Sequence, residues 1–264
     1  MLMDPVTIMT ALASGALVGL LLSSFGGGGS VLAAPLLLYF VGVGDPHVAI
    51  GTSAAAVAAT ALISLFGHWK GGRVKWPCAS VFAGAGLIGS ILGSTIAKVI
   101  QGDQLLLGFS IAMVAIALSM FRKPKTTGDP DVHLDFRLLV RLLPLGVLVG
   151  FAAGFFGIGG GFLIVPGLLY ATGMTMAAAT ASSLVSVSLF GAATSSNYAL
   201  DGLVDYRLAA LLLAGGFVGG LAGQYVAKLL EPRAQLARKA FASFIILVAA
   251  YVGWNAISSL TAVA

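Results

Sequence analysis

Long apolar segments alternate with short polar ones along the whole chain, and this pattern restricts the protein to a membrane. Only 9% of the residues are charged, against roughly 25% in an ordinary soluble domain. A soluble fold needs more polar side chains than this to cover its surface, and a disordered chain needs low hydrophobicity. The pattern therefore predicts an all-α integral membrane protein and excludes a cytosolic enzyme.

The apolar segments form two groups of five on either side of one polar linker, residues 122–141. We expect a first transmembrane repeat at 1–121, a cytoplasmic linker at 122–141 and a second transmembrane repeat at 142–264. Two segments are short, because 15 helical residues reach about 22 Å and the hydrocarbon core is roughly 30 Å thick. The ten segments are 6–25, 29–43, 46–66, 77–99, 105–121, 142–156, 159–173, 175–199, 207–230 and 236–260.

The two halves repeat one another in sequence. Glycine, proline and tyrosine recur at an offset of 131 as far as Gly42, which matches Gly173. One residue is then lost, and an offset of 130 continues as far as Lys98, which matches Lys228. A register kept over so many residues indicates a duplicated unit rather than a chance alignment of glycine-rich helices.

The positions of lysine and arginine decide between two topologies. If only the eight longer segments cross, the 14 basic residues divide nine to five; if all ten cross, they divide twelve to two. Cytoplasmic loops carry the basic excess, so ten crossings are expected, with only Lys98 and Arg207 on the other side. Five crossings per repeat make the repeats inverted and place both termini outside the cytoplasm. The net charge of +5 then reflects membrane orientation, and no nucleic-acid partner is expected.

A glycine-rich break precedes each short segment. The residues are Gly26, Gly27, Gly28, Gly29 and Ser30 in the first half, and Gly157, Gly159, Gly160 and Gly161 in the second. A helix that starts inside the membrane has unpaired N–H groups and partial positive charge, and bare glycine lets a ligand approach. Matching breaks in inverted repeats are typical of transporters that bind substrate near the midplane. The pattern favours an anion site over glycines that only allow close helix crossing.

Hydroxyl side chains follow each break. Thr52 and Ser53 stand near the start of the next helix, and Ser182 and Ser183 hold the matching positions. We expect these four hydroxyls to converge near one midplane cavity and donate to an anion; the alternative is that each bonds to its own helix. Asn197 belongs to a polar cluster without a counterpart in the first half, where it either tunes selectivity or caps the helix end.

These motifs resemble the sulfite exporter TauE/SafE family over about residues 10–255. The second break, Gly157-Ile158-Gly159-Gly160-Gly161-Phe162, is the closer match. The first has Gly27 where a larger apolar residue is usual and Ser30 in the last glycine position, and Ala-Ser-Ser replaces the usual Thr-Ser in the second half. The resemblance implies a carrier of the bacterial inner membrane, so the termini that the charges place outside the cytoplasm would be periplasmic. Its substrates would be small sulfur-containing anions such as sulfite, sulfonates or sulfoacetate, usually moved outward.

Other functions receive less support. An intramembrane hydrolase needs a nucleophile with a base, and no Asp or Glu lies deep in an apolar segment. An anion channel or a carrier of another small organic anion remains the alternative, and the chain is not expected to be an enzyme. No cofactor or metal is expected, because the single cysteine, Cys78, provides neither a disulfide nor a metal site. Lys98 is expected to snorkel, and the expected partners are the anion, the lipid bilayer and, in a homodimer, a second chain.

Overall fold

The computed structural model describes residues 4–121, 128–129, 132, 134–157, 161–230 and 234–263. As predicted, the described chain is helical and contains no strand, only one isolated bridge between Asp129 and Met174. Eight of its helices are long and apolar enough to cross a membrane. They are α1 (Pro5–Phe25), α3 (Pro46–Lys70), α4 (Trp76–Ala97), α5 (Gly102–Met120), α6 (Phe136–Phe156), α8 (Met176–Ala199), α9 (Tyr206–Leu230) and α10 (Ala234–Val263).

The two short segments differ from each other in regularity. The first consists of a 3₁₀-helix, η1 (Gly26–Leu32), one turn of α2 (Ala33–Pro35) and a π-helix, η2 (Leu36–Val41). Four glycines disfavour α-helix, and Pro35 removes a donor, so the hydrogen-bond register shifts along this segment. The second short segment is the regular helix α7 (Gly161–Thr172). Both end at a glycine with positive φ, 87° at Gly42 and 69° at Gly173.

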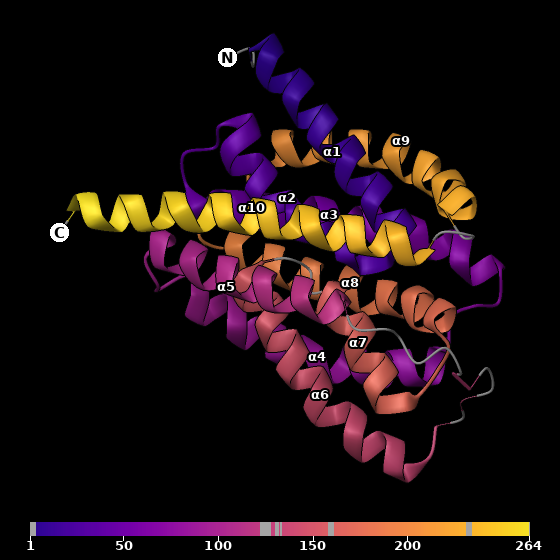
Figure 1. Cartoon of the computed structure of the whole chain (residues 1–264). Coiled ribbons are helices and arrows are strands. Elements are labelled where there is room, and N and C mark those ends of the chain that lie inside the picture. Colours follow the sequence, from indigo (N-terminus) through magenta and orange to yellow (C-terminus); the bar gives the residue numbers. More distant parts are fainter. Residues whose placement is uncertain are drawn as a thin grey trace.

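Helices α3 and α8 form the centre of the bundle. They pack against each other, while α1 lies on α9, α6 lies on α4 and α5 lies on α10 (Figure 1). By the sequence repeat, α1 corresponds to α6 and α9 to α4, so each outer pair joins the two halves of the chain. The two short segments are also in contact with each other, through the packing of α7 against η1.

Glycines bring these outer pairs into backbone contact. A Cβ added to Gly19 of α1 would collide with the backbone of Gly216 on α9, and one added to Gly150 of α6 would collide with the backbone of Gly86 on α4. Gly19 matches Gly150 and Gly216 matches Gly86 by the offsets of the repeat. Equivalent positions therefore make equivalent contacts, of the close kind that small residues allow between membrane helices.

One end of the bundle, here called the acidic end, is formed by loops 42–45, 98–101 and 200–205. Gly102 packs against Pro46, and Lys98 forms an ion pair with Asp201, which joins these loops. Helix α1 runs parallel to α9 and starts at this end, and α10 runs back to it beside α5 (Figure 1). Both ends of the described chain therefore lie at the acidic end.

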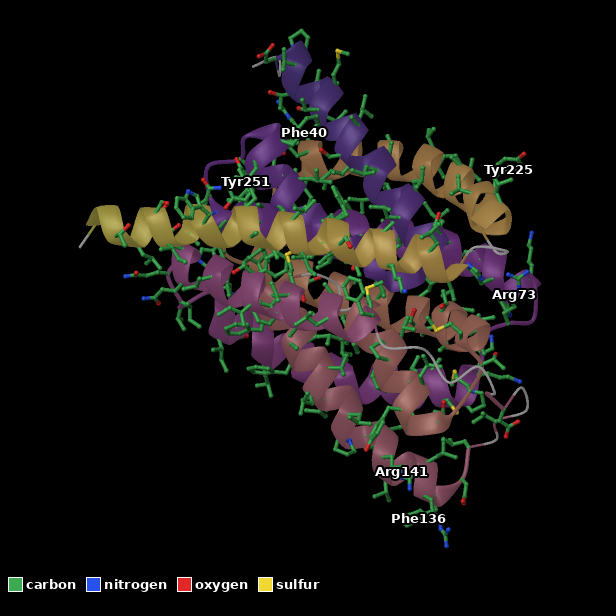
Figure 2. The ribbon with its side chains drawn as sticks, viewed as in Figure 1. Phe40, Arg73, Phe136, Arg141, Tyr225 and Tyr251 are labelled. Carbon is green, nitrogen blue, oxygen red and sulfur yellow. The ribbon has the colours of Figure 1, made fainter. Side chains whose placement is uncertain are left out.

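The opposite end, here called the basic end, contains loop 71–75 and loop 173–175. The backbone N–H of Lys75 donates to Ser182 Oγ at 3.0 Å, and that of Asp129 donates to the carbonyl of Gly173 at 2.9 Å. Arg73 lies at this end, far from Phe40 and Tyr251 at the other (Figure 2).

The first helix of the second half begins at Phe136 rather than at Leu142, inside the expected linker. The carboxylate of Asp135 accepts from the N–H of Phe136 at 2.6 Å. This cap starts the helix early because the residues that follow are mostly apolar and continue the helical pattern.

Candidate functional site

The buried polar side chains gather on the two central helices. Fifteen Ser and Thr side chains are buried among the described residues, and nine of them lie on α3 and α8. Polar groups inside a membrane domain are costly and usually functional, so this pair is the candidate pathway. The nine are Thr52, Ser53, Thr60, Ser64, Ser182, Ser183, Ser186, Thr194 and Ser195.

Two of the predicted site hydroxyls bond within their own helices. Ser53 Oγ donates to the carbonyl of Ile50 at 3.0 Å, and Ser183 Oγ donates to the carbonyl of Thr180 at 2.8 Å. The two bonds are equivalent by the repeat. They match the alternative stated from the sequence, in which the helix backbone takes the hydroxyl proton.

The other two predicted hydroxyls tie helix starts to loops. Thr52 Oγ1 accepts from the N–H of Asp205 at 2.9 Å, and Ser182 Oγ accepts from the N–H of Lys75 at 3.0 Å. Lys75 and Asp205 are themselves equivalent in the repeat. Neither hydroxyl has an acceptor among the described residues, so each proton is available to a ligand.

The expectation that these hydroxyls converge is wrong. Thr52 lies beside the loop before α9 at the acidic end, and Ser182 lies beside the loop before α4 at the basic end. From Thr52 the helix α3 continues to Lys70, a length of about 27 Å at 1.5 Å per residue. Helices α3 and α8 run antiparallel, so equivalent residues near their starts lie at opposite ends and only their middles approach each other.

The first break does not form the expected open helix start. Gly26, Gly27, Gly28, Gly29 and Ser30 all belong to η1, which follows α1 directly. Its 3₁₀ turns pair backbone N–H groups that an open start would leave free. Gly29 lies so close to α1 that a Cβ would collide with the backbone of Leu22, and Ser30 is buried.

The second break ends α6 and is followed by a regular α-helix. Gly157 ends α6 in the left-handed region with φ 66°, and its N–H donates to the carbonyl of Gly154 at 3.3 Å. A Cβ at Gly157 would collide with Ile50 of α3. Gly161 is the first residue of α7, whereas Gly159 and Gly160 lie outside the described residues. An α-helix thus starts inside the bundle, next to the central pair.

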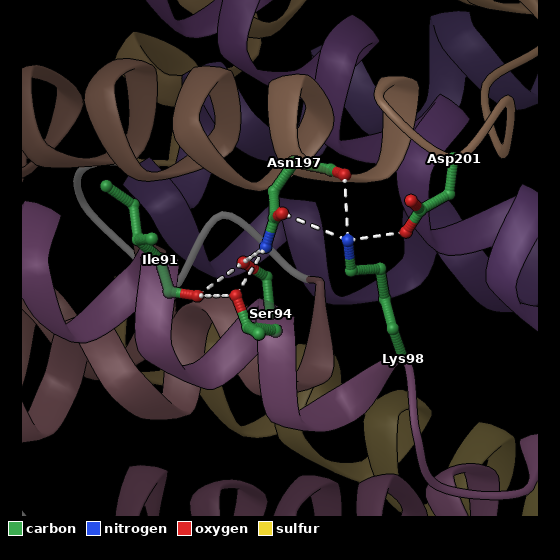
Figure 3. Close-up of polar contacts among 6 residues, drawn as sticks. Ile91, Ser94, Lys98, Asn197 and Asp201 are labelled. Carbon is green, nitrogen blue, oxygen red and sulfur yellow. Dashed lines mark hydrogen bonds and ion pairs between the residues drawn. The ribbon is translucent and has the colours of Figure 1, made fainter.

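Asn197 joins α8 to α4 rather than facing a cavity. Its Nδ2 donates to Ser94 Oγ at 2.7 Å and to Thr95 Oγ1 at 2.9 Å, and its Oδ1 accepts from Lys98 Nζ at 3.0 Å (Figure 3). The ammonium of Lys98 also pairs with Asp201, in the loop after α8. Sequence reasoning missed this pair because Lys98 and Asp201 are distant in the chain and meet only through the packing of α4 on α8.

A further group that the sequence did not point to is Tyr198, close to the end of α8. Its side chain is fully buried, and its hydroxyl has no partner among the described residues. The ring stacks on His47 of α3, with 6.2 Å between ring centroids. The available signal was a tyrosine, one of two aromatic side chains in a helix of mostly small residues.

A helical membrane bundle with two interrupted helices and hydroxyl-bearing central helices is the architecture of a multi-pass membrane transporter. The model of the sulfite exporter TauE/SafE family matches residues 11–252, and the chain belongs to this family. A "Probable membrane transporter protein" of Xylella fastidiosa strain 9a5c is 44% identical over 258 residues, which cover 97% of this chain and 98% of the relative. "Probable membrane transporter protein YunE" of Bacillus subtilis is 26% identical, with 83% and 88% covered. No solved structure matches the chain significantly.

Proposed function

We propose that this membrane transporter is a secondary carrier that exports small sulfur-containing oxyanions of the sulfite, sulfonate or sulfoacetate type. The observation that carries the proposal is the start of α7 inside the bundle, beside two central helices whose buried polar side chains are all hydroxyls. Backbone N–H groups at a helix start and hydroxyl protons both donate to anionic oxygen. The choice of sulfur-containing anions as substrates follows from the family to which the chain belongs.

The absence of buried charge among the described residues suits a carrier. A fixed cation would hold an anion tightly in a medium of low dielectric constant, and release would be slow. Neutral donors bind an anion with modest free energy each, about 1.5–3 kcal/mol per hydrogen bond to a charged group. Thr52 and Ser182, which keep their protons available, are then contacts near the two ends of the pathway, and the second break supplies the central one.

Contacts within the bundle support an inverted repeat of five segments in each half. The Gly19–Gly216 and Gly150–Gly86 contacts are equivalent, as are the bonds of Thr52 and Ser182. Helix α3 runs antiparallel to its counterpart α8, as inversion requires. In this arrangement the two halves exchange conformations and the site opens alternately to each side.

The charges of the two ends support an orientation and a direction. The acidic end carries Asp45, Asp201 and Asp205, while the basic end carries Arg73 and Lys75. By the positive-inside rule the basic end faces the cytoplasm of a bacterial inner membrane, which places both termini in the periplasm. Positive potential at the inner mouth raises the local anion concentration there, which favours export.

Ligand binding to the purified protein tests the proposal. Sulfite, a simple sulfonate and sulfoacetate are added to the detergent-solubilised protein, with acetate and chloride as anions of other classes. The expected result is a rise in Tm with at least one sulfur oxyanion and none with acetate or chloride, because a ligand of the native state stabilises it. Equal effects of all five anions, or of none, contradict the proposed substrate class.

A further inference from the structure

A series of hydrogen bonds joins α4 to α8 over the part of the two helices nearer the acidic end. Ser90 Oγ lies 3.1 Å from Thr194 Oγ1 and donates to the carbonyl of Phe190 at 3.1 Å. Towards the acidic end the bonds of Asn197 to the hydroxyls of α4 continue the series (Figure 3). We name this contact the polar seam; it consists of Ser90, Ser94, Thr95, Lys98, Thr194, Asn197 and Asp201.

Lys98 closes the polar seam at the acidic end. Its Nζ donates to the carbonyl oxygen of Asn197 at 3.1 Å and to its Oδ1 at 3.0 Å, and pairs with the carboxylate of Asp201. The side chain of Lys98 is only 15% exposed, so water screens these contacts incompletely. Separating α4 from α8 at this end therefore requires one ammonium to lose three partners.

The counterpart contact, between α9 and α3 at the basic end, keeps Ser64, Gln224 and Lys228 by sequence but lacks three groups of the polar seam. By the repeat, Gly220 stands where α4 has Ser90, Gly67 where α8 has Asn197, and Gly71 where the loop after α8 has Asp201. Glycine offers no side chain for a hydrogen bond or an ion pair. The polar seam is therefore stronger than the counterpart contact, although the helices that form the two contacts are equivalent by the repeat.

A small pocket lies in the counterpart contact, beside Gly220. It measures about 20 Å³, and Thr60, Ser64, Gly220 and Gln224 are among the residues that line it. Ser64 matches Thr194 of the polar seam. Its hydroxyl has no acceptor among the described side chains, whereas Thr194 pairs with Ser90.

We propose that the polar seam is the gate at the acidic end, that Lys98 locks it, and that the α3–α9 contact is the weaker gate at the basic end. The inference rests on the proposed transporter function, because a carrier closes one end of its pathway while the other end is open. The polar seam would close the acidic end, and the α3–α9 contact would close the basic end. The resting protein is closed at the acidic end and opens first at the basic end, which is the order that export requires. Lys98 acts by holding α4 to α8 and does not bind the anion.

The labelling rates of two single cysteines test the gate, in a background in which Cys78→Ala has removed the native thiol. Ala97→Cys places a thiol in the buried acidic-end contact with Tyr198, and Ser64→Cys places one in the basic-end pocket. Each is combined with Lys98→Met, and labelling by a soluble maleimide is followed without substrate. We expect labelling at position 97 to accelerate about tenfold, the effect of about 1.4 kcal/mol, and labelling at position 64 to slow.

Opposite changes in the labelling rates at positions 97 and 64 would show that Lys98 locks a gate and does not merely stabilise the fold. Loosening of the fold would accelerate labelling at both positions, and that result, or no change at either, overturns the proposal. Lys70→Met is the control, because it removes the ammonium of an exposed lysine at the end of α3, and it should leave both rates unchanged. The exchange Lys98→Asp with Asp201→Lys should restore the rates of the parent.

If Lys98→Met does not insert stably, Asp201→Asn replaces it, with the same expected and contrary results. The labelling experiment needs no substrate. Failure to bind or carry sulfur oxyanions would therefore refute the proposed function without changing the labelling rates.

Discussion

Gly157 combines a left-handed backbone with a close contact to a second helix. At φ 66° any L-residue is strained, and a Cβ would also collide with the Cγ2 atom of Ile50. We predict that Gly157→Ala destabilises the protein by more than the about 1–2 kcal/mol of the backbone strain alone. The measurement is the Tm of the purified variant.

A second substitution separates the two causes. Ile50→Ala removes the colliding methyl group, so the double variant should lose less stability than the sum of the single variants. Gly44→Ala is the control, because Gly44 has open space around it and no positive φ. Strictly additive losses would show that Ile50 does not contact a side chain at position 157.

Thr52 and Ser182 are predicted to contribute equally to stability. Thr52→Val leaves the N–H of Asp205 without its acceptor, and Ser182→Ala does the same to Lys75. Each should lower the free energy of unfolding by about 1 kcal/mol, the usual cost of a lost hydrogen bond. Thr52→Ser keeps the oxygen and should change little. A clear loss in only one of the two variants would contradict the equivalence of the two loops.

At the scale of the helices, the outer pairs depend on bare glycine. Gly19→Ala and Gly150→Ala each place a methyl group against the backbone of the facing helix. We predict similar losses of about 1–3 kcal/mol, as for other overpacked contacts. Gly84→Ala on α4 is the control, because nothing lies within 4 Å of its added Cβ. Thermal unfolding of the three variants in one detergent gives the comparison.

The sequence predicted the helical elements well because their boundaries follow hydropathy and loop residues. Two features of the site escaped it. Repetition of the four glycines suggested two equal breaks, and the chain turns back at both, yet only the second is followed by a regular α-helix, because η1 continues α1 in 3₁₀ turns. The convergence of Thr52 with Ser182 failed because a sequence repeat does not reveal how far its members lie from the symmetry axis.

For the whole molecule, the topology is the first expectation to test. Two reporters fused after Ala264 test it. Alkaline phosphatase folds in the periplasm and should be active, whereas a fluorescent protein that folds only in the cytoplasm should give no fluorescence. The physical reason is the concentration of twelve of the 14 basic residues on the other side. A bright cytoplasmic reporter would contradict the orientation and the crossing number together.

The distribution of charge and hydroxyls relates the whole bundle to its proposed work. In the proposed cycle, an anion is gathered at the basic end, meets neutral donors along α3 and α8, and leaves past the polar seam. This sequence of events needs no buried carboxylate. A coupling proton can travel on the substrate itself, because sulfite titrates near neutrality.

The most direct test of the central claim is flux of radiolabelled sulfite in liposomes that contain the purified protein. We predict efflux that saturates with sulfite concentration, is reduced by excess unlabelled sulfonate or sulfoacetate, and shows counterflow when unlabelled sulfite is placed on the opposite side. Acetate should not compete. Flux no greater than in protein-free liposomes, for sulfite and for both competitors supplied as labelled substrates, would contradict the assignment of this transporter to sulfur-containing oxyanions.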